Sequence, residues 1–229
     1  GNKSANNNEG SLGLLHPPRG DRRDLSAWTW TPWSDAGWIM SIQPLDVNRD
    51  GQLDVLVSDR YGPRAGIAWY ENPGKDKAVW PRHDVCKMDV QALFLTPATL
   101  EANRTDVLIA SSKAILWYKL NGELRETIPL PNWCGSGKAV SSGDLDGDQQ
   151  ADIVFTCENA VGERSGIAWA KRGPTGWQFH DIGGPPGIKY DLCPLVDLDD
   201  DGDLDVITTE EREGPQGGLG VVWYENPRK

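Results

Sequence analysis

One short acidic loop recurs three times in the chain and constrains its fold more than any other feature. The copies read DVNRDGQLD at 46–54, DLDGDQQAD at 144–152 and DLDDDGDLD at 197–205. Positions 1, 3, 5 and 9 of every copy carry an oxygen-bearing side chain. Such a loop can turn alternate side chains inward around a hard cation, and the ligand type indicates Ca²⁺. Asp and Gly also favour solvated turns, but three copies in the same phase favour calcium.

The residues after each loop indicate a β-structure. Apolar segments follow at 55–57, 153–155 and 206–207. An EF-hand would instead continue into a helix and would close with a Glu at position 12 of its loop. We therefore expect each loop to connect two strands.

The charge of the chain is explained by these loops. The formal net charge is −11 over 229 residues, and the three loops place eleven carboxylates at their ligand positions. The acidity therefore indicates no separate basic partner. The sequence has no basic stripe suited to nucleic acid and no apolar run long enough to predict a membrane span.

The cysteines and the calcium loops give information about the cellular compartment of the protein. The four cysteines, Cys86, Cys134, Cys157 and Cys193, form no CxxC pair, so zinc is not indicated. One or two disulfides and free buried thiols are both compatible with the sequence. Calcium loops suit compartments rich in calcium, so we expect a secreted, periplasmic or cell-surface protein.

A tryptophan motif sets the length of a repeat. Trp69, Trp117, Trp169 and Trp223 each end a short apolar segment, at spacings of 48, 52 and 54 residues. With strands before and after each loop and a closing strand such as 80–85, each repeat has four short strands. Repeats of about 50 residues with four strands are typical of β-propeller blades. These tryptophans are expected to pack between the sheets.

The repeats run over about 38–85, 86–133, 134–184 and 185–229. The second repeat is degenerate, because Ala98, Leu100 and Ala102 replace the ligands and Asp106 alone remains. We expect no calcium there.

The two ends of the chain fit together in this scheme. Residues 1–26 read as a flexible lead-in, in which 12–15 fits a short strand. The segment WTWTPWSD at 28–35 resembles the closing strands at 80–84 and 177–181, and the last repeat stops after its third strand. We therefore predict an all-β propeller domain over 27–229, with four-stranded antiparallel blades, most simply four, and with 27–37 closing the last blade. The alternative is a fragment or half of a larger propeller.

The pattern D-x-[DN]-x-D-[GQ]-x-x-D, followed by an apolar strand and G-[IV]-[AV]-W-[YA], resembles the FG-GAP/VCBS repeat family, which includes the integrin α-subunit head. The resemblance covers about 190 residues and implies three Ca²⁺ sites, each between the first and second strands of a blade. The side-chain ligands that it implies are Asp46, Asn48, Asp50, Asp54, Asp144, Asp146, Asp148, Asp152, Asp197, Asp199, Asp201 and Asp205. The implied backbone-carbonyl ligands are Gln52, Gln150 and Asp203. Gln149 departs from the pattern by replacing a loop glycine, and four repeats are fewer than is usual in the family.

Ligand residues are expected on the face opposite the calcium loops, because loops on a rigid scaffold often carry function. The candidates are Asp59, Arg60, Tyr61, His83, Glu158, His180, Tyr190 and Glu211. His83 and His180 occupy the same place in a Trp-x-x-His-Asp repeat, which favours a structural role for both. Asp59, Glu158 and Glu211 follow the second strand of three repeats, where they line a channel mouth or form salt bridges with neighbouring arginines.

Three classes of function fit these features. The favoured one is a calcium-stabilised binding module whose partner is a glycan or an extracellular protein. The second is a sugar-processing enzyme similar to aldos-2-ulose dehydratases or polysaccharide lyases, with His83, His180, Tyr61 and Tyr190 as candidate bases on the face opposite the calcium loops. The third is a structural domain of a larger secreted protein. No motif ties the candidate bases together, so binding is favoured over catalysis.

Overall fold

The computed structural model describes residues 10–74, 79–101, 104–184, 187–212 and 217–227. The first nine residues of the predicted lead-in lie outside this part of the chain, as do 185–186 and 228–229 at the ends of the last predicted repeat. The chain divides into two compact units, Gly1–Ala92 and Leu93–Lys229.

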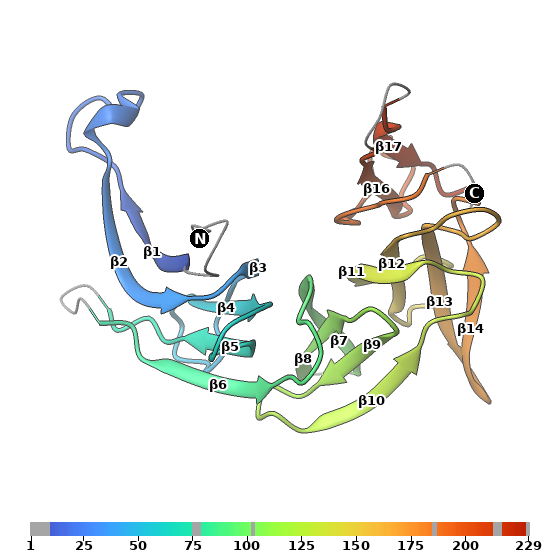
Figure 1. The fold of residues 1–229 in the computed structure, drawn as a ribbon, viewed down its shortest axis with the longest axis horizontal. Coiled ribbons are helices and arrows are strands. Elements are labelled where there is room, and N and C mark those ends of the chain that lie inside the picture. Colours follow the sequence, from blue (N-terminus) through green and yellow to red (C-terminus); the bar gives the residue numbers. More distant parts are fainter. Residues whose placement is uncertain (1–9, 75–78, 102–103, 185–186, 213–216, 228–229) are drawn as a thin grey trace. The chain divides into compact units, whose positions relative to one another are not determined.

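The first unit holds a hairpin and one four-stranded antiparallel sheet (Figure 1). Its elements are β1 (Gly10–His16), the 3-10 helix η1 (Leu25–Ala27), β2 (Thr29–Ala36), β3 (Ile39–Leu45), β4 (Asp54–Asp59), β5 (Gly66–Tyr70) and β6 (Arg82–Lys87). β1 pairs with β2, and the larger sheet has the order β3-β4-β5-β6. Consecutive strands are therefore neighbours, as the four-strand repeat predicts.

The predicted lead-in contributes a strand and a core residue. Leu12 of β1 is 2% exposed and packs in one cluster with Val57, Ala68 and Tyr70. Trp33 of β2 packs against the same cluster and stacks on Trp80 with 4.5 Å between the ring centroids. Burial of these apolar side chains fixes the hairpin on the first unit.

The second unit holds three sheets. Its strands are β7 (Leu95–Glu101), β8 (Arg104–Ala110), β9 (Ala114–Tyr118), β10 (Leu124–Pro129), β11 (Ser136–Gly143), β12 (Asp152–Glu158), β13 (Ile167–Gly173), β14 (Gly176–Asp181), β15 (Leu195–Val196), β16 (Asp205–Glu210) and β17 (Gly220–Tyr224). The sheet orders are β7-β8-β9-β10, β11-β12-β13-β14 and β15-β16-β17. The prediction of an all-β fold with four-stranded antiparallel sheets is confirmed, and the last sheet has three strands.

All four large sheets share one register. The residue two places after the last loop Asp, or after Asp106 in the second repeat, pairs with the tryptophan of the third strand. The four pairs are Leu56–Trp69, Leu108–Trp117, Val154–Trp169 and Ile207–Trp223. The degenerate second repeat thus keeps the strand geometry of the others, although its sequence has lost the other ligands.

The inner strands form the core because their sequences are rich in β-branched and aromatic residues. All but one residue of β12 are buried, whereas exposed and half-buried residues alternate along β14 at its sheet edge. Val154 and Ile167 pack with Leu145 and Val206, so the acidic loops join a shared core of the second unit. Among the described residues no helix is long and apolar enough to cross a membrane.

Candidate metal loops and ligand pocket

The first Asp of each loop organises the turn. Asp46 accepts hydrogen bonds from the backbone N–H groups of Asp50 and Gly51 at 3.1 and 3.0 Å. The loop at 197–205 repeats both bonds at the same distances, and the loop at 144–152 makes a closely related pair. These bonds wrap the backbone of each loop around the carboxylate of its first Asp.

Each loop takes its shape from two left-handed residues, at positions 4 and 6. Their φ angles are 63° at Arg49, 85° at Gly51, 73° at Gly147, 67° at Gln149, 63° at Asp200 and 93° at Gly202. Gln149 therefore adopts the backbone of the glycine that it replaces. In that loop a glycine, Gly147, occupies position 4 instead, and both positions keep the left-handed backbone seen in the other two loops.

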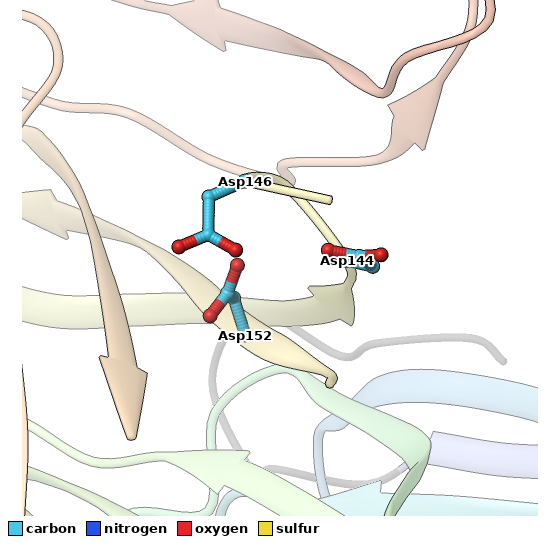
Figure 2. Close-up of side chains that lie close together, drawn as sticks. All are labelled: Asp144, Asp146 and Asp152. Carbon is cyan, nitrogen blue, oxygen red and sulfur yellow. The ribbon is translucent and has the colours of Figure 1, made fainter. Parts of the chain in front are cut away.

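Two loops gather carboxylates closely enough to share a cation. One oxygen from each of Asp144, Asp146 and Asp152 lies within 4.8 Å of the others, and Asp197, Asp199 and Asp201 form a second such group. Figure 2 shows the Asp146 and Asp152 carboxylates facing each other. Ca²⁺ binds oxygen at about 2.3–2.6 Å, so ligands on opposite sides of the ion are separated by about 5 Å.

The remaining predicted ligands lie outside these two groups. Asp148, Asp205 and the acids of the loop at 46–54 belong to neither group, within the part of the chain that the structure describes. Position 7 of each loop donates its backbone N–H to the position-5 Asp; these residues are Gln52, Gln150 and Asp203. Their carbonyl groups remain predicted ligands.

The last Asp of the loop ties the loop to the end of the third strand. Asp54 accepts the backbone N–H of Val47 at 3.0 Å and that of Asn72 at 2.8 Å. Asp205 accepts the equivalent bond from Asn226 at 2.8 Å. The Tyr-Glu-Asn-Pro motif that follows two of the strand-three tryptophans therefore has a role that its sequence alone does not reveal.

These bonds decide the ionisation of Asp205. Burial raises its pKa, but hydrogen bonds from the backbone N–H groups of Asn226 and Leu198 and from the Trp223 indole outweigh burial, so the pKa falls below its ordinary value. The Asp205 carboxylate is thus ionised and fixed before any cation binds.

Asp152, at the same position of another loop, is shifted in the opposite direction. Burial raises its pKa to about 6, with the nearby Asp146 and Asp148 adding to the shift against the hydrogen bond from Leu145 N. In this repeat the residue at the place of the motif Asn is Arg172. Lys171 instead reaches into the loop, where its Nζ lies 2.9 Å from Asp146 Oδ2. A protein cation therefore already faces this carboxylate group.

The degenerate second repeat satisfies its remaining Asp within the protein. Asp106 is 1% exposed and accepts hydrogen bonds from Arg104 and from the Trp117 indole, the latter at 2.8 Å. Ala98 lies on β7, and Ala102 is outside the described residues. The absence of calcium here stays a prediction, supported by the two donors on Asp106.

In the first unit the predicted ligand residues make internal contacts. Asp59 is 4% exposed and accepts the backbone N–H groups of Gly37 and Trp38 at 2.8 and 2.7 Å. The Arg60 guanidinium lies 5.0 Å from the ring centroids of both Trp38 and Tyr61. These bonds and stacking contacts hold the turn after β4 in place.

The two predicted histidines occupy equivalent structural positions. His83 pairs with Trp69 across the sheet and stacks on it at 4.2 Å, and His180 stacks on Trp169 at 4.6 Å. His83 Nε2 also lies 2.8 Å from Glu71 Oε2. The observed contacts support the structural reading of both histidines.

Two predicted ligand residues from different repeats converge on one pocket of the second unit. Glu158 and Glu211 line a pocket of about 460 Å³ together with Asn159, Lys189 and Arg212. Lys189 forms an ion pair with Glu211. Asn159, Lys189 and Arg212 were not among the predicted ligand residues; Asn159 has a left-handed backbone with φ at 57°.

Charged groups beneath the pocket hold Glu158 in place. Lys138 is 7% exposed, and its Nζ lies 3.1 Å from Glu158 and 3.6 Å from Asp191. Tyr190, the remaining predicted ligand residue, is fully buried and its hydroxyl lies 3.3 Å from that of Tyr224. Burial raises the Tyr190 pKa far above its ordinary value, so this hydroxyl stays protonated.

A second, more apolar pocket of about 390 Å³ lies beside the loop at 144–152. Trp169, Tyr224 and Ile182 supply its apolar surface, and Asp146 and Glu225 supply carboxylates. Trp169 also stacks on His180 and packs against the core cluster of this unit.

Comparison with known proteins assigns the chain to no family. No protein-family model matches the sequence, and no curated protein is significantly similar to it. The residues and their geometry therefore carry the functional argument.

Proposed function

We propose that the chain is a secreted, calcium-stabilised β-propeller of the FG-GAP/VCBS type that binds carbohydrate or protein. The predicted architecture is four blades, with residues 27–37 closing the last one. The common register of the four repeats supports blades of one design, and the three-stranded last sheet is compatible with a fourth strand.

The calcium part of the proposal is supported by the shared loop geometry. Three loops place left-handed residues at the same two positions, and two of them bring three carboxylate oxygens within 4.8 Å of one another. All donors are hard oxygens, which suit Ca²⁺ better than a softer transition metal. Calcium would offset the repulsion between these carboxylates and so stabilise the folded loops.

The pocket lined by Glu158 and Glu211 is the single observation that carries the binding part. Its lining combines carboxylates, ammonium and guanidinium groups and an amide. A sugar hydroxyl both donates and accepts hydrogen bonds, so a hydroxyl-rich ligand can satisfy groups of both kinds at once. This chemistry favours carbohydrate over an apolar ligand.

An array of immobilised neutral, acidic and amino-sugar oligosaccharides, probed in calcium, tests this function. We expect binding that Arg212→Ala weakens at least tenfold, because the guanidinium lines the pocket, and that Arg164→Ala leaves unchanged, because this exposed arginine lies outside the lining. Failure to bind any of the glycans would contradict the carbohydrate proposal and favour a protein partner or a purely structural domain.

Thermal unfolding tests the calcium part independently. Because the ion binds only the folded loops, excess chelator should lower the Tm, and added Ca²⁺ should restore it in a concentration-dependent way. Mg²⁺ should restore less, since it demands a smaller and more regular octahedral site. The same melting curve in chelator and in millimolar Ca²⁺ would refute calcium binding.

A further inference from the structure

Two of the four cysteines lie on neighbouring backbone segments inside the second unit. Cys134 and Cys157 are free thiols that are 4% and 0% exposed, and the Cys134 side chain has the largest effect on the pKa of Cys157. The sequence left disulfides and free thiols equally open, and the structure now brings one specific pair together.

The backbone fixes this proximity. Gly135 approaches Glu158 so closely that a Cβ atom on it would lie 2.4 Å from the Glu158 carbonyl oxygen. Each of these residues is the chain neighbour of one of the cysteines. Both segments are also held by the same short stretch, since Gly135 N donates to Ser165 O at 3.0 Å and Cys157 N to Gly166 O at 2.7 Å. A disulfide needs the two backbones to be this near, with Cα atoms less than about 7 Å apart.

The third buried cysteine, Cys193, has different neighbours from Cys134 and Cys157. The Cys193 thiol contacts Ser141 Oγ at 3.8 Å and the Val154 carbonyl oxygen at 3.6 Å. Cys86 lies on β6 of the first unit and is partly exposed. Within the second unit, the close approach of Gly135 to Glu158, the neighbours of Cys134 and Cys157, therefore favours pairing of these two cysteines.

We propose that Cys134 and Cys157 form a disulfide when the chain folds in an oxidising environment. The oxidant is a small-molecule disulfide such as glutathione disulfide. Each cysteine loses its thiol proton, one sulfur–sulfur bond forms, and two electrons pass to the oxidant, whose own sulfur–sulfur bond is cleaved to give two thiols. The bond joins the segment before β11 to the end of β12 and adds a covalent link at this end of the sheet.

The bond forms during folding rather than afterwards. The neighbouring Cys134 side chain, and after it burial, raises the pKa of the Cys157 thiol well above its ordinary value. Exchange requires a thiolate that the oxidant can reach, and the folded core provides neither. Once formed, the buried bond is protected from reductants for the same reason.

Peptide mapping tests the proposal directly, because trypsin separates all four cysteines. The denatured full chain is refolded in calcium with a mixture of oxidised and reduced glutathione, its free thiols are alkylated in denaturant, and it is digested without reduction. Cys134 falls in peptide 126–138 and Cys157 in peptide 139–164, whereas Cys86 falls in 83–87 and Cys193 in 190–212. We expect peptides 126–138 and 139–164 to be linked, and the other two cysteines to be alkylated.

Variants and stability complete the test. Cys193→Ser should keep the linked pair, and Cys157→Ser should remove it. Wild-type chain refolded in reductant should have a Tm on the order of 10 °C below that of wild-type chain refolded with glutathione disulfide, a comparison that needs no variant to fold. Alkylation of Cys134 and Cys157 in the refolded chain, or a link from either of them to Cys193, would overturn the proposal.

Discussion

The Arg104 guanidinium holds both carboxylate oxygens of Asp106, with Nε 2.9 Å from Oδ1 and Nη2 3.0 Å from Oδ2. Asp106 is the one acid that the second repeat keeps from the calcium pattern. Two protein groups, this guanidinium and the Trp117 indole, thus bind the carboxylate that faces the metal loop in other repeats. Arg104 and Asp106 both lie on β8, and the hydrogen bond from the Trp117 indole ties this strand to β9 without an ion.

Replacing Asp106 should therefore destabilise the fold without changing its response to calcium. Asp106→Ala leaves the buried Trp117 N–H without an acceptor, and we expect the free energy of unfolding to fall by about 1–3 kcal/mol. Urea unfolding in calcium and in chelator measures both effects. The calcium-dependent gain should equal that of the wild type, and a smaller gain would show that the second repeat binds calcium after all. Glu123→Ala, on an exposed turn of the same repeat, is the control.

Gln149 adopts a backbone conformation that suits glycine, with φ at 67°. Gln149→Gly removes the strain between its Cβ and the backbone, partly offset by the extra freedom of glycine in the unfolded chain, so we expect a net gain of about 0.5–1 kcal/mol. Gln150→Gly, one place later and outside the left-handed pair, should give no gain. Chemical unfolding of the two variants side by side measures the difference, and equal effects would contradict the conformational argument.

Lys171 should weaken calcium binding by the loop at 144–152. Its ammonium group lies 2.9 Å from Asp146 Oδ2, so a bound Ca²⁺ must share that carboxylate with a positive charge. Lys171→Met should raise the calcium affinity of this loop roughly tenfold, as expected for one unit charge near the ion in a partly solvated site. Calorimetric titration of the chain measures the affinities, with Lys119→Met as the control because that lysine pairs with Glu123 instead. An unchanged affinity would mean that Lys171 swings away at no cost.

Much of the fold follows from local sequence patterns. The three acidic loops and the recurring tryptophans predict where strands begin and end, because position 9 of each loop opens a strand and a fixed register follows from it. The strand predicted before the loop at 46–54 is β3 (Ile39–Leu45), and the predicted closing strand at 80–85 overlaps β6 (Arg82–Lys87). These elements depend on near-neighbour contacts, which a repeat makes visible.

The parts of the site that were missed depend on contacts between distant residues. Lys171 looks like an ordinary surface cation in the sequence, and its role appears once the strands bring it to Asp146, 25 residues away along the chain. The pocket likewise joins the turn at Asn159 to Lys189 and Arg212, which come from a different repeat. Isolated charges carry no periodic signal, so sequence patterns cannot assign them partners.

Glu210 offers a test of how buried carboxylates hold the last sheet together. It is 3% exposed, and its carboxylate accepts backbone N–H groups from Ile188 at 2.8 Å, Lys189 at 3.4 Å and Leu219 at 2.7 Å. The amide of Glu210→Gln has one acceptor oxygen and must turn its NH₂ group toward one of these donors. We expect a loss of about 1–3 kcal/mol at pH 7, measured by urea unfolding.

The pH dependence of the stability lost in Glu210→Gln shows whether the ionised carboxylate or only the packing of the side chain stabilises the sheet. Burial raises the Glu210 pKa, but the backbone N–H groups outweigh burial and bring the pKa below its ordinary value of 4.5. The stability that this carboxylate contributes is therefore fully present above the ordinary pKa and is lost as the pH falls through the lowered one. The difference between wild type and Glu210→Gln should stay constant from pH 7 to about 5 and shrink below about 4, whereas Glu163→Gln, at an exposed position, should show no such trend. A difference that persists unchanged at pH 3.5 would mean that packing, and not the ionised carboxylate, holds these three backbone groups.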